Sequence, residues 1–299
     1  MPLKFETDDS KKCYETLRAD LANIVQETEY DELYGHKLTP DAQFYNEGVV
    51  DNLIYKFCKA NQFELEGSKS QLVKTLKWRK EFRPLHAAFS ETHDSMLNDV
   101  CAITVDEKND ANQKVISWNL YGLLVKHKEV FEDTDKFLRF RIGLMERGLQ
   151  LLDFESEDNH LMTQVHDYDN VSMWKLDPGI KKCSKAIIEV FQDFYPETLF
   201  SKFFVNVPYI MSWLYEIVKR FVSEDTRKKF IVLSDGKQMK EYLKFPPKEY
   251  GGQATLESSK LKKVTPNAYV AHLLTLEDEK TTVSTTADPL RNEAILTVD

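Results

Sequence analysis

The strongest constraint on the fold is a strand–helix–strand pattern between residues 204 and 233. Phe204–Val207 and Phe230–Leu233 are short apolar runs, which are typical of buried strands. Between them, Ile210–Arg220 has the apolar spacing of a helix. Strands of one sheet that are joined through a helix run parallel, with a right-handed crossover. The segment therefore predicts a parallel strand pair and an α/β fold.

Turn-forming strings border this pattern. Upstream, Tyr-Pro-Glu-Thr occupies residues 195–198, where Pro196 disfavours helix at the preceding tyrosine. Pro208 ends the first strand within Phe-Val-Asn-Val-Pro, and the second strand lies within Lys-Lys-Phe-Ile-Val-Leu-Ser (228–234). Downstream, Pro-Pro-Lys-Glu-Tyr-Gly-Gly (246–252) closes the segment with two glycines, which can turn where a bulky side chain cannot. The four strings in this order are more specific than any one of them.

The remaining sequence predicts helices and strands on both sides of this segment. Helices are predicted at 11–27, 48–60, 69–82, 134–152, 180–194 and 267–276, and strands at Cys101–Val105, Val115–Leu120, Leu161–Val165 and Val171–Leu176. Strands that alternate with helices favour a mixed, largely parallel sheet. We expect an N-terminal helical module at 1–93, a sheet domain at 94–265, and a C-terminal helix with a mobile tail at 266–299, the tail being 279–299.

Composition narrows the class of function. The 299 residues carry a net charge of −9, which argues against nucleic-acid binding, although a local patch can still contact a membrane. The four cysteines are scattered without zinc-site spacing, which argues against a disulfide framework. The start of the chain has no apolar signal core, and no apolar run approaches the ~18 residues of a membrane span. We expect a soluble cytoplasmic protein with free thiols.

Two polar residues are predicted to share one face of a strand. In Gln164-Val-His-Asp-Tyr168, alternation places His166 and Tyr168 on the face of Gln164, with Val165 and Asp167 opposite. One interpretation is a hydrogen-bonded pair in the core. The other is a ligand site, because imidazole and phenolate both bind iron and tyrosinate is an established haem ligand.

A third polar residue interrupts an apolar helical stripe. Arg141 lies among Phe137, Leu144 and Leu151 at helical spacing. A guanidinium in such a stripe calls for an anion. That anion is either an internal Asp or Glu, or a carboxylate or phosphate of a bound ligand. Lys202 and Tyr121 are weaker candidates for the same ligand site.

The helix at 210–222 allows two interpretations. Its apolar residues cover more than one face, which is typical of a core helix. Trp213 and Lys219-Arg220 would also suit contact with a membrane interface. The sequence has no Gly-x-Ser-x-Gly elbow and no glycine-rich phosphate loop, so nothing supports nucleophilic catalysis.

The four strings together resemble the CRAL-TRIO lipid-binding family, which includes the fungal phosphatidylinositol-transfer proteins. Upstream, the stretch from Asn52 to Glu64 and the stretch from Leu76 to Phe82 resemble that family's N-terminal helices, so the resemblance covers about residues 48–252. It implies a helical module followed by a domain whose sheet lines a ligand cavity, closed by a gating helix. The gate residues would be Trp213, Leu214 and Ile217.

Within that family, the chain looks closest to a divergent fungal branch that binds haem b. The matching strings are Trp118–Gly122, Phe140–Glu146, Met162–Tyr168 and Lys202–Pro208. The resemblance implies Tyr168 as the axial iron ligand, His166 beside the iron, and Tyr121, Arg141 and Lys202 as pocket and propionate contacts. The branch has a tyrosine near the haem where this chain has Asn61.

The wider family's phosphatidylinositol headgroup residues carry over less completely. The resemblance implies Glu197 and Lys229 at the headgroup, whereas a third position, a lysine in the family, is Gln62 here. Losing a cation that meets an anionic headgroup should weaken that site.

The resemblance implies a non-enzymatic protein that binds haem b and phosphatidylinositol, with a role in phosphoinositide homeostasis or in sensing haem or oxidants. It would lie in the cytoplasm with transient peripheral contact to the endoplasmic reticulum or other internal membranes. Two alternatives stay open: a tyrosinate-ligated haem enzyme with peroxidase-like activity, and a module that presents lipid to a lipid kinase. The sequence leaves the oligomeric state open.

Overall fold

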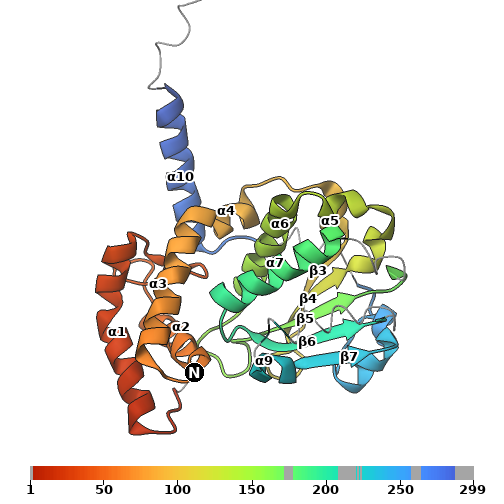
Figure 1. Cartoon of the computed structure of the whole chain (residues 1–299), viewed down its shortest axis with the longest axis horizontal. Coiled ribbons are helices and arrows are strands. Elements are labelled where there is room, and N and C mark those ends of the chain that lie inside the picture. The colour runs from red at the N-terminus through yellow and green to blue at the C-terminus, as the bar shows by residue number, and fades with distance from the viewer. Residues whose placement is uncertain are drawn as a thin grey trace, which may run out of the picture.

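The computed structural model describes residues 3–171, 178–207, 220, 222, 224–256 and 264–286. A layer of helices packs beside a domain built on a five-stranded sheet (Figure 1). The helices are α1 (Asp8–Thr28), α2 (Glu47–Ala60), α3 (Leu65–Phe82), α4 (Pro84–Phe89), α5 (Ser95–Asp99), α6 (Thr134–Leu149), α7 (Pro178–Phe194), α9 (Glu224–Lys228) and α10 (Ala268–Thr286). The strands are β1 (Glu32–Leu33), β2 (His36–Lys37), β3 (Cys101–Val105), β4 (Val115–Leu120), β5 (Met162–Asp167), β6 (Leu199–Val205) and β7 (Phe230–Leu233). Short 3-10 helices are η1 (Tyr121–Lys126), η2 (Lys128–Phe131), η5 (Gly236–Glu241) and η6 (Lys248–Tyr250).

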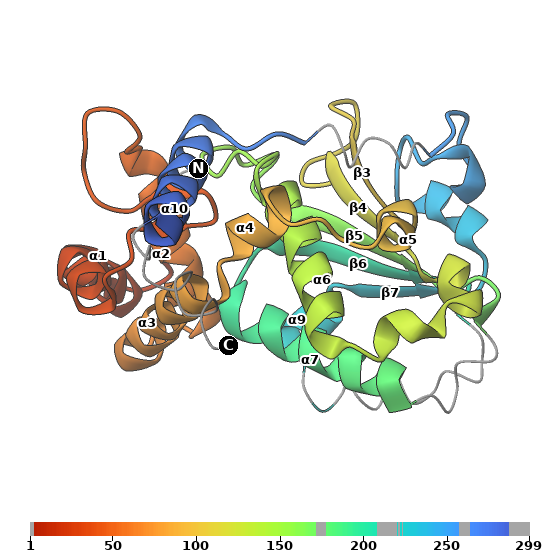
Figure 2. The same ribbon diagram turned by 90° about the horizontal axis from the view of Figure 1, so that it is seen from above.

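The main sheet has the strand order β3-β4-β5-β6-β7. Strands β3 and β4 are antiparallel, and β4 to β7 run parallel. The predicted parallel pair at 204–233 and the mixed, largely parallel sheet are therefore confirmed. Figure 2 shows α6 and α7 lying along one face of the sheet. On the other face, η5 and η6 cover a second, smaller core that includes Trp118, Val165 and Tyr250.

Local sequence explains where the helices of the ligand domain begin and how they pack. Asp133 caps α6, because its carboxylate accepts a hydrogen bond of 3.0 Å from the backbone N–H of Lys136. Helix α3 ends at Phe82, its C-cap residue Arg83 has φ of 54°, and the following Pro84 starts α4. Helix α6 then crosses α4 closely at Gly143, where a Cβ atom would lie 2.6 Å from the carbonyl oxygen of Ala87.

A buried ion network joins the N-terminal helices to the sheet domain. The Arg79 guanidinium on α3 donates to both carboxylate oxygens of Glu146 on α6, at 2.6 and 3.1 Å, and to Glu32 at 2.7 and 3.0 Å. The hydroxyl of Tyr195 donates to Glu146 at 2.6 Å. Removing one member of such a network leaves an unpaired buried charge, which is strongly destabilising. The network therefore favours one position of the N-terminal helices relative to the sheet domain.

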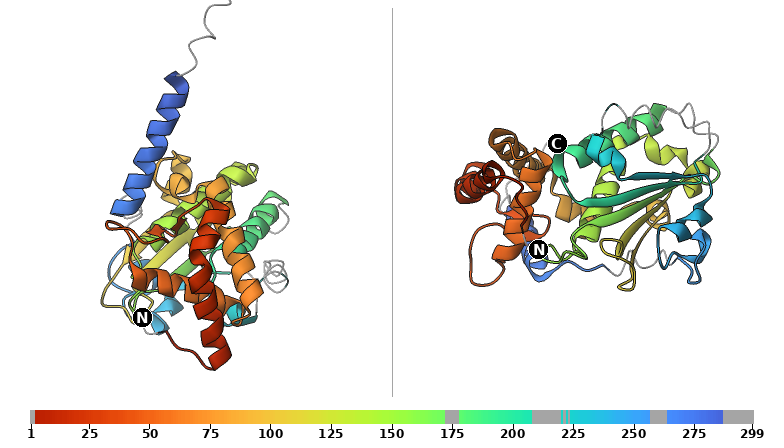
Figure 3. Two further views of the ribbon diagram at one scale, coloured as in Figure 1. Left: turned by 90° about the vertical axis from the view of Figure 1, so that its left-hand side faces the viewer. Right: turned by 90° about the horizontal axis from the view of Figure 1, so that it is seen from below.

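Several predicted boundaries differ from the structure. Helix α10 runs to Thr286, ten residues beyond the predicted helix end at 276 and into the segment predicted as a tail from 279, whereas the mobility of that tail stays a prediction. Figure 3 shows α10 standing away from the body of the molecule. The strand predicted at Phe204–Val207 begins five residues earlier, at Leu199, and ends at Val205, because Asn206 takes a left-handed φ of 54°. Helix α6 ends at Leu149 rather than at 152.

Two predicted elements lie outside the described residues. The strand predicted at Val171–Leu176 has only Val171 described, and the helix predicted at Ile210–Arg220 has only Arg220 described. The gate residues Trp213, Leu214 and Ile217 fall in the same gap, so their role stays a prediction. The predicted domain boundaries at 93 and 265 are not tested by the fold and also stay predictions.

Candidate ligand-binding site

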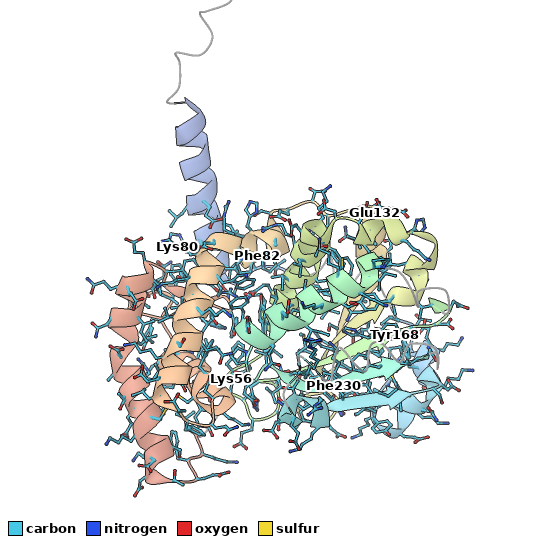
Figure 4. The ribbon with its side chains drawn as sticks, in the orientation of Figure 1. Lys56, Lys80, Phe82, Glu132, Tyr168 and Phe230 are labelled. Carbon is cyan, nitrogen blue, oxygen red and sulfur yellow. The ribbon has the colours of Figure 1, made fainter. Side chains whose placement is uncertain are left out.

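A cavity of about 550 Å³ opens between the N-terminal helices and the sheet. Its size is in the range of small-molecule and cofactor sites. Its walls come from α2, α3, α6 and α7, from the turn at 195–199, and from β5, β6 and β7. Gln164 and Lys202 line it from the sheet. In Figure 4, Phe230 lies at the amino end of its strand beside this cavity, and Tyr168 lies toward the carboxyl ends of the strands.

Farther along the same strands, the structure brings the predicted aromatic site residues together. The ring centroids of Tyr121 and His166 lie 5.3 Å apart, and those of Tyr121 and Tyr168 lie 5.7 Å apart. The His166 ring also lies 5.7 Å from that of Phe204, which is its register partner on β6. These four side chains are buried. The placement of His166 and Tyr168 on one side of the sheet is therefore confirmed.

His166 and Tyr168 are not the hydrogen-bonded core pair that the sequence left open. Their ring centroids are 6.5 Å apart, and the buried Nε2 atom of His166 has no hydrogen-bond partner in the described part of the chain. A buried polar atom without a partner costs free energy, so it calls for an explanation. A ligand in this region would supply one.

Arg141 is buried on α6 and meets a neutral partner. Its Nη1 atom donates to Oδ1 of Asn119 on β4, and its Nε atom has no partner among the residues that the structure describes. Its guanidinium lies 6.0 Å from the ring centroid of Phe191. No described Asp or Glu forms an ion pair with it. The interpretation that an internal carboxylate neutralises Arg141 finds no support in this part of the chain.

Burial sets the protonation states of the cluster. It lowers the pKa of His166 well below the usual value, with help from Lys202 and Arg141, so the imidazole is neutral. Burial raises the pKa of Tyr168 well above normal, while Arg141 opposes the rise. Burial likewise raises the pKa of Tyr121 to about 12. Without a ligand, the cluster therefore holds neutral rings beside the cationic Arg141 and favours an anion.

Lys202 is the second cation of this region. It is buried, and burial followed by repulsion from Arg141 lowers its pKa to about 7. Its ammonium lies 5.5 Å from the Phe204 ring centroid and 5.8 Å from that of Phe230. Because Lys202 lines the cavity and its ammonium also lies beside the Phe204 ring, it connects the cavity to the aromatic cluster.

The cavity mouth carries the residues predicted at a lipid headgroup. The Glu197 carboxylate pairs with Lys59 at 3.2 Å and with Lys229 at 3.5 Å, and Gln62 lines the same mouth. Burial alone would raise the pKa of Glu197, but Lys229 and Lys59 hold it below its usual value. The structure thus brings Glu197, Lys229 and Gln62 together, as the resemblance implies. Their role in headgroup binding stays a prediction.

Lys56 contacts the turn that carries Glu197 at this mouth, and sequence reasoning missed it. Its buried ammonium donates to the backbone carbonyls of Glu197 at 2.8 Å and His160 at 3.2 Å, and so supports the Tyr-Pro-Glu-Thr turn where Glu197 has φ of 49°. Figure 4 labels Lys56 at this junction. The Lys at 56 lies within an apolar helical pattern, as Arg141 does, and that signal could have identified it.

Asn61 also lines the cavity, at the position where the haem-binding branch has a tyrosine. Its side-chain amide donates to the carbonyl of Phe57 at 2.9 Å and to Gln71 Oε1 at 2.6 Å. These bonds satisfy the amide within the N-terminal module. Asn61 therefore provides no aromatic contact to a ligand.

Two of the sequence strings have a structural role on the opposite face of the sheet. The Tyr250 hydroxyl donates to Asp167 Oδ2 at 2.7 Å, and the Asn206 amide donates to Asp167 Oδ1 at 2.8 Å. Asn206 Oδ1 in turn accepts from the backbone N–H of Gly236 at 2.7 Å. The Tyr250 ring stacks on Trp118 with centroids 4.7 Å apart. Phe-Val-Asn-Val-Pro and Pro-Pro-Lys-Glu-Tyr-Gly-Gly thus contribute to a satisfied polar network.

The described residues hold no group of three or more His, Cys, Asp or Glu side chains that could bind a bare metal ion. Among the described helices, none combines the length and apolarity that a bilayer crossing requires.

Comparison with known proteins identifies the class. Residues 101–252 match the CRAL/TRIO domain, and residues 13–74 match the CRAL/TRIO N-terminal domain. The chain belongs to the CRAL/TRIO family, which confirms the predicted family and fold class.

Two named relatives and one crystal structure are similar to this chain over most of its length. The chain is 81% identical over 293 residues to the phosphatidylinositol transfer protein SFH5 of Kluyveromyces lactis, which covers 98% of this chain and 99% of that protein. It is 47% identical over 285 residues to SFH5 of Saccharomyces cerevisiae, covering 91% of this chain and 97% of that protein. A crystal structure of Sfh5 superimposes with a TM-score of 0.89 at 46% identity, covering 93% of this chain and all of that one.

Proposed function

We propose that this protein binds haem b between the sheet and helices α6 and α7, and acts as a carrier or sensor rather than an enzyme. The observation that carries the proposal is a buried cluster with unsatisfied polar atoms and two cations, Arg141 and Lys202, without a described carboxylate partner. Haem would supply what this cluster lacks, namely an iron for a phenolate and two carboxylates for the cations.

Each residue of the cluster has a defined part in this proposal. Tyr168 would hold the iron through its phenolate oxygen, with His166 beside it and Tyr121 against the pocket. Arg141 and Lys202 would bind the propionates. Because burial raises the pKa of Tyr168, the side chain stays protonated without a ligand, and a bound cation is needed to ionise it. Arg141 favours that ionisation, since it already lowers the pKa of Tyr168.

We also propose phosphatidylinositol binding and weak transfer. The relatives at 81% and 47% identity are named phosphatidylinositol transfer proteins. At the cavity mouth, Glu197 and Lys229 occupy the headgroup positions of the family, and Gln62 replaces a cation that would meet an anionic headgroup. Exchange of lipid requires transient contact with a membrane, which we place at the cytoplasmic side of the endoplasmic reticulum or another internal membrane. Phosphoinositide homeostasis or the sensing of haem and oxidants would be the corresponding cellular roles.

The absorption spectrum of the freshly purified full chain tests the haem proposal. We expect a high-spin ferric spectrum of the phenolate type, and we expect Tyr168→Phe to remove most of the haem while the protein stays folded by circular dichroism. Tyr242→Phe, at an exposed tyrosine that follows η5, is the matched control and should keep wild-type haem. A Tyr168→Phe protein with full haem and an unchanged spectrum would reject the axial assignment.

Peroxide turnover by the haem-loaded protein separates a carrier from an enzyme. Peroxidase chemistry requires acid–base groups at an open coordination position. We propose that His166, which burial keeps neutral, lies beside the iron and does not serve as such a group. We expect turnover no higher than that of an equal concentration of free haem. Turnover well above that level would favour the enzyme alternative.

A further inference from the structure

Lys202 differs from the lysines at the cavity mouth, because none of the described residues gives it an acidic partner. Lys59 and Lys229 pair with Glu197, at 3.2 and 3.5 Å. Lys202 is 8% exposed and lines the cavity, and its ammonium lies beside the rings of Phe204 and Phe230. No carboxylate in the described ranges lies within ion-pair distance of it. Its amine therefore faces a space that a ligand can enter.

The surroundings of Lys202 are those of nucleophilic lysines. A lysine becomes a nucleophile when an apolar site removes its hydration or when another cation lies nearby, because both favour the neutral amine. Both conditions hold here, since burial and then Arg141 lower the pKa of Lys202 to about 7. About half of such amines are neutral at pH 7, compared with roughly one in 2,500 for an ordinary exposed lysine.

We propose that Lys202 forms a reversible imine with long-chain aliphatic aldehydes that enter this cavity. The apolar residues Ile188, Phe191, Leu199 and Phe230 line the same space and suit an alkyl chain. An aldehyde carbonyl at Lys202 would place its chain along these residues. This activity goes beyond haem and phosphatidylinositol binding, because it captures a carbonyl compound covalently.

The reaction balances without any oxidant or reductant. The lone pair of the neutral amine attacks the carbonyl carbon, a carbon–nitrogen bond forms, and the carbonyl oxygen takes the proton that the nitrogen gives up. The resulting carbinolamine loses its hydroxyl with a second proton as one water molecule, which leaves a carbon–nitrogen double bond. Gln164 lies opposite Lys202 in the register and lines the same cavity, so its amide is a polar neighbour for the hydroxyl. Addition of water reverses each step.

Reductive trapping on the full-length protein tests the proposal. Haem-free protein is incubated near neutral pH with dodecanal and cyanoborohydride, which reduces an imine to a stable secondary amine, and the modified lysines are mapped by peptide mass spectrometry. We expect Lys202 to be alkylated at least about tenfold faster than Lys240, an exposed lysine on η5, because of its larger neutral fraction. Propanal, which lacks the long chain, should reduce this preference.

Two variants sharpen the result. Lys202→Met should abolish the fast modification, and Lys240→Met should leave it unchanged. Equal rates at Lys202 and Lys240 in the wild-type protein would overturn the proposal, and that measurement does not depend on whether any variant folds. Addition of haem should slow trapping at Lys202 if a propionate occupies the amine. Fast trapping that haem does not slow would contradict the propionate contact of Lys202 while leaving the imine established.

Discussion

The two faces of the sheet treat buried polar groups in opposite ways, although alternate residues of one strand supply both. On the face covered by η5 and η6, Asp167 accepts hydrogen bonds from Tyr250 and Asn206, so both carboxylate oxygens are satisfied. On the face covered by α6 and α7, the preceding residue, His166, keeps an unpartnered Nε2 atom among the described residues, and Arg141 keeps an unpartnered Nε atom.

This difference in hydrogen bonding indicates different roles for the two faces. A satisfied buried network costs little to keep and fixes the loop that carries it, whereas an unsatisfied one costs free energy that only a ligand can return. Evolution tolerates such a cost at functional sites. We therefore propose that the Asp167 face serves folding and that the His166 face serves ligand binding, and the predictions below change one face at a time.

After loss of the axial Tyr168, loss of Arg141 should produce the largest change in ligand binding. In Arg141→Ala, one charge-assisted contact to a propionate disappears, worth about 1.5–3 kcal/mol, so haem affinity should fall about 10- to 150-fold. The free energy of unfolding of the haem-free protein should not fall comparably, because the guanidinium has a neutral partner in Asn119. Haem titration and urea unfolding of the haem-free protein measure the two quantities.

Arg139→Ala is the matched control on the same helix. Arg139 is partly buried and pairs with Glu91, away from the cluster. Its loss should leave haem affinity unchanged. If Arg141→Ala strongly destabilises the haem-free protein and binds haem as the wild type does, Arg141 has a structural role and the comparison between the faces fails.

Tyr250→Phe should give the opposite result. The hydroxyl of Tyr250 donates to the Asp167 carboxylate, and losing a hydrogen bond to a charged group costs about 1.5–3 kcal/mol. We expect the free energy of unfolding to fall by that amount while haem content and spectrum stay unchanged. Urea unfolding and the absorption spectrum of one preparation check both. Loss of haem without loss of stability would show that the two faces are coupled.

Sequence reasoning placed the buried polar residues better than it placed the scaffold around them. Strand alternation correctly placed His166 and Tyr168 on one side, and the interrupted apolar stripe correctly identified Arg141 as buried. Both follow from local periodicity, which a single sequence contains. The network of Asp167, Tyr250 and Asn206 could not be found, because it joins segments 39 and 83 residues apart.

The predicted end of α10 and the predicted start of β6 were wrong for a related reason. The sequence around 279 is polar and rich in threonine, so local propensity predicted a tail, but α10 continues from a packed start where Tyr269 donates to the carbonyl of Asp31 at 2.7 Å. Helical propagation beyond a fixed first turn adds one hydrogen bond per residue and tolerates a poor sequence. The start of β6 was missed because Leu199–Lys202 mixes polar and apolar residues, and its strand pairing with β5 comes from the fold.

The stability of the haem-free protein should also depend on pH through Lys202. The folded-state pKa of Lys202 is lowered to about 7 from 10.5, so the unfolded chain binds the extra proton between these values. Stability of the haem-free protein should therefore rise with pH in this window, by up to about 1.4 kcal/mol per unit from this group. In Lys202→Met, the rise should shrink by that amount, although Lys56, whose pKa is also lowered to about 7, contributes in both proteins. Urea unfolding at several pH values gives the difference, and equal slopes for the two proteins would contradict the buried, unpaired state of Lys202.

The smallest expected effect lies at the cavity mouth, which belongs to neither face. Gln62 lines the mouth beside Glu197 and Lys229, where the family has a cation. In Gln62→Lys, a half-exposed ammonium would add about 0.5–1 kcal/mol of attraction to an anionic headgroup, so transfer of phosphatidylinositol between vesicles should rise about two- to fivefold. Ser70→Lys, on α3 at the same mouth, adds an equal charge at a position that the headgroup set does not use, and it should raise transfer less. Because either lysine adds the same net charge, equal gains would point to general attraction to the vesicle surface. A gain confined to Gln62→Lys would locate the headgroup beside Glu197, and no gain from either variant would remove the headgroup from this mouth.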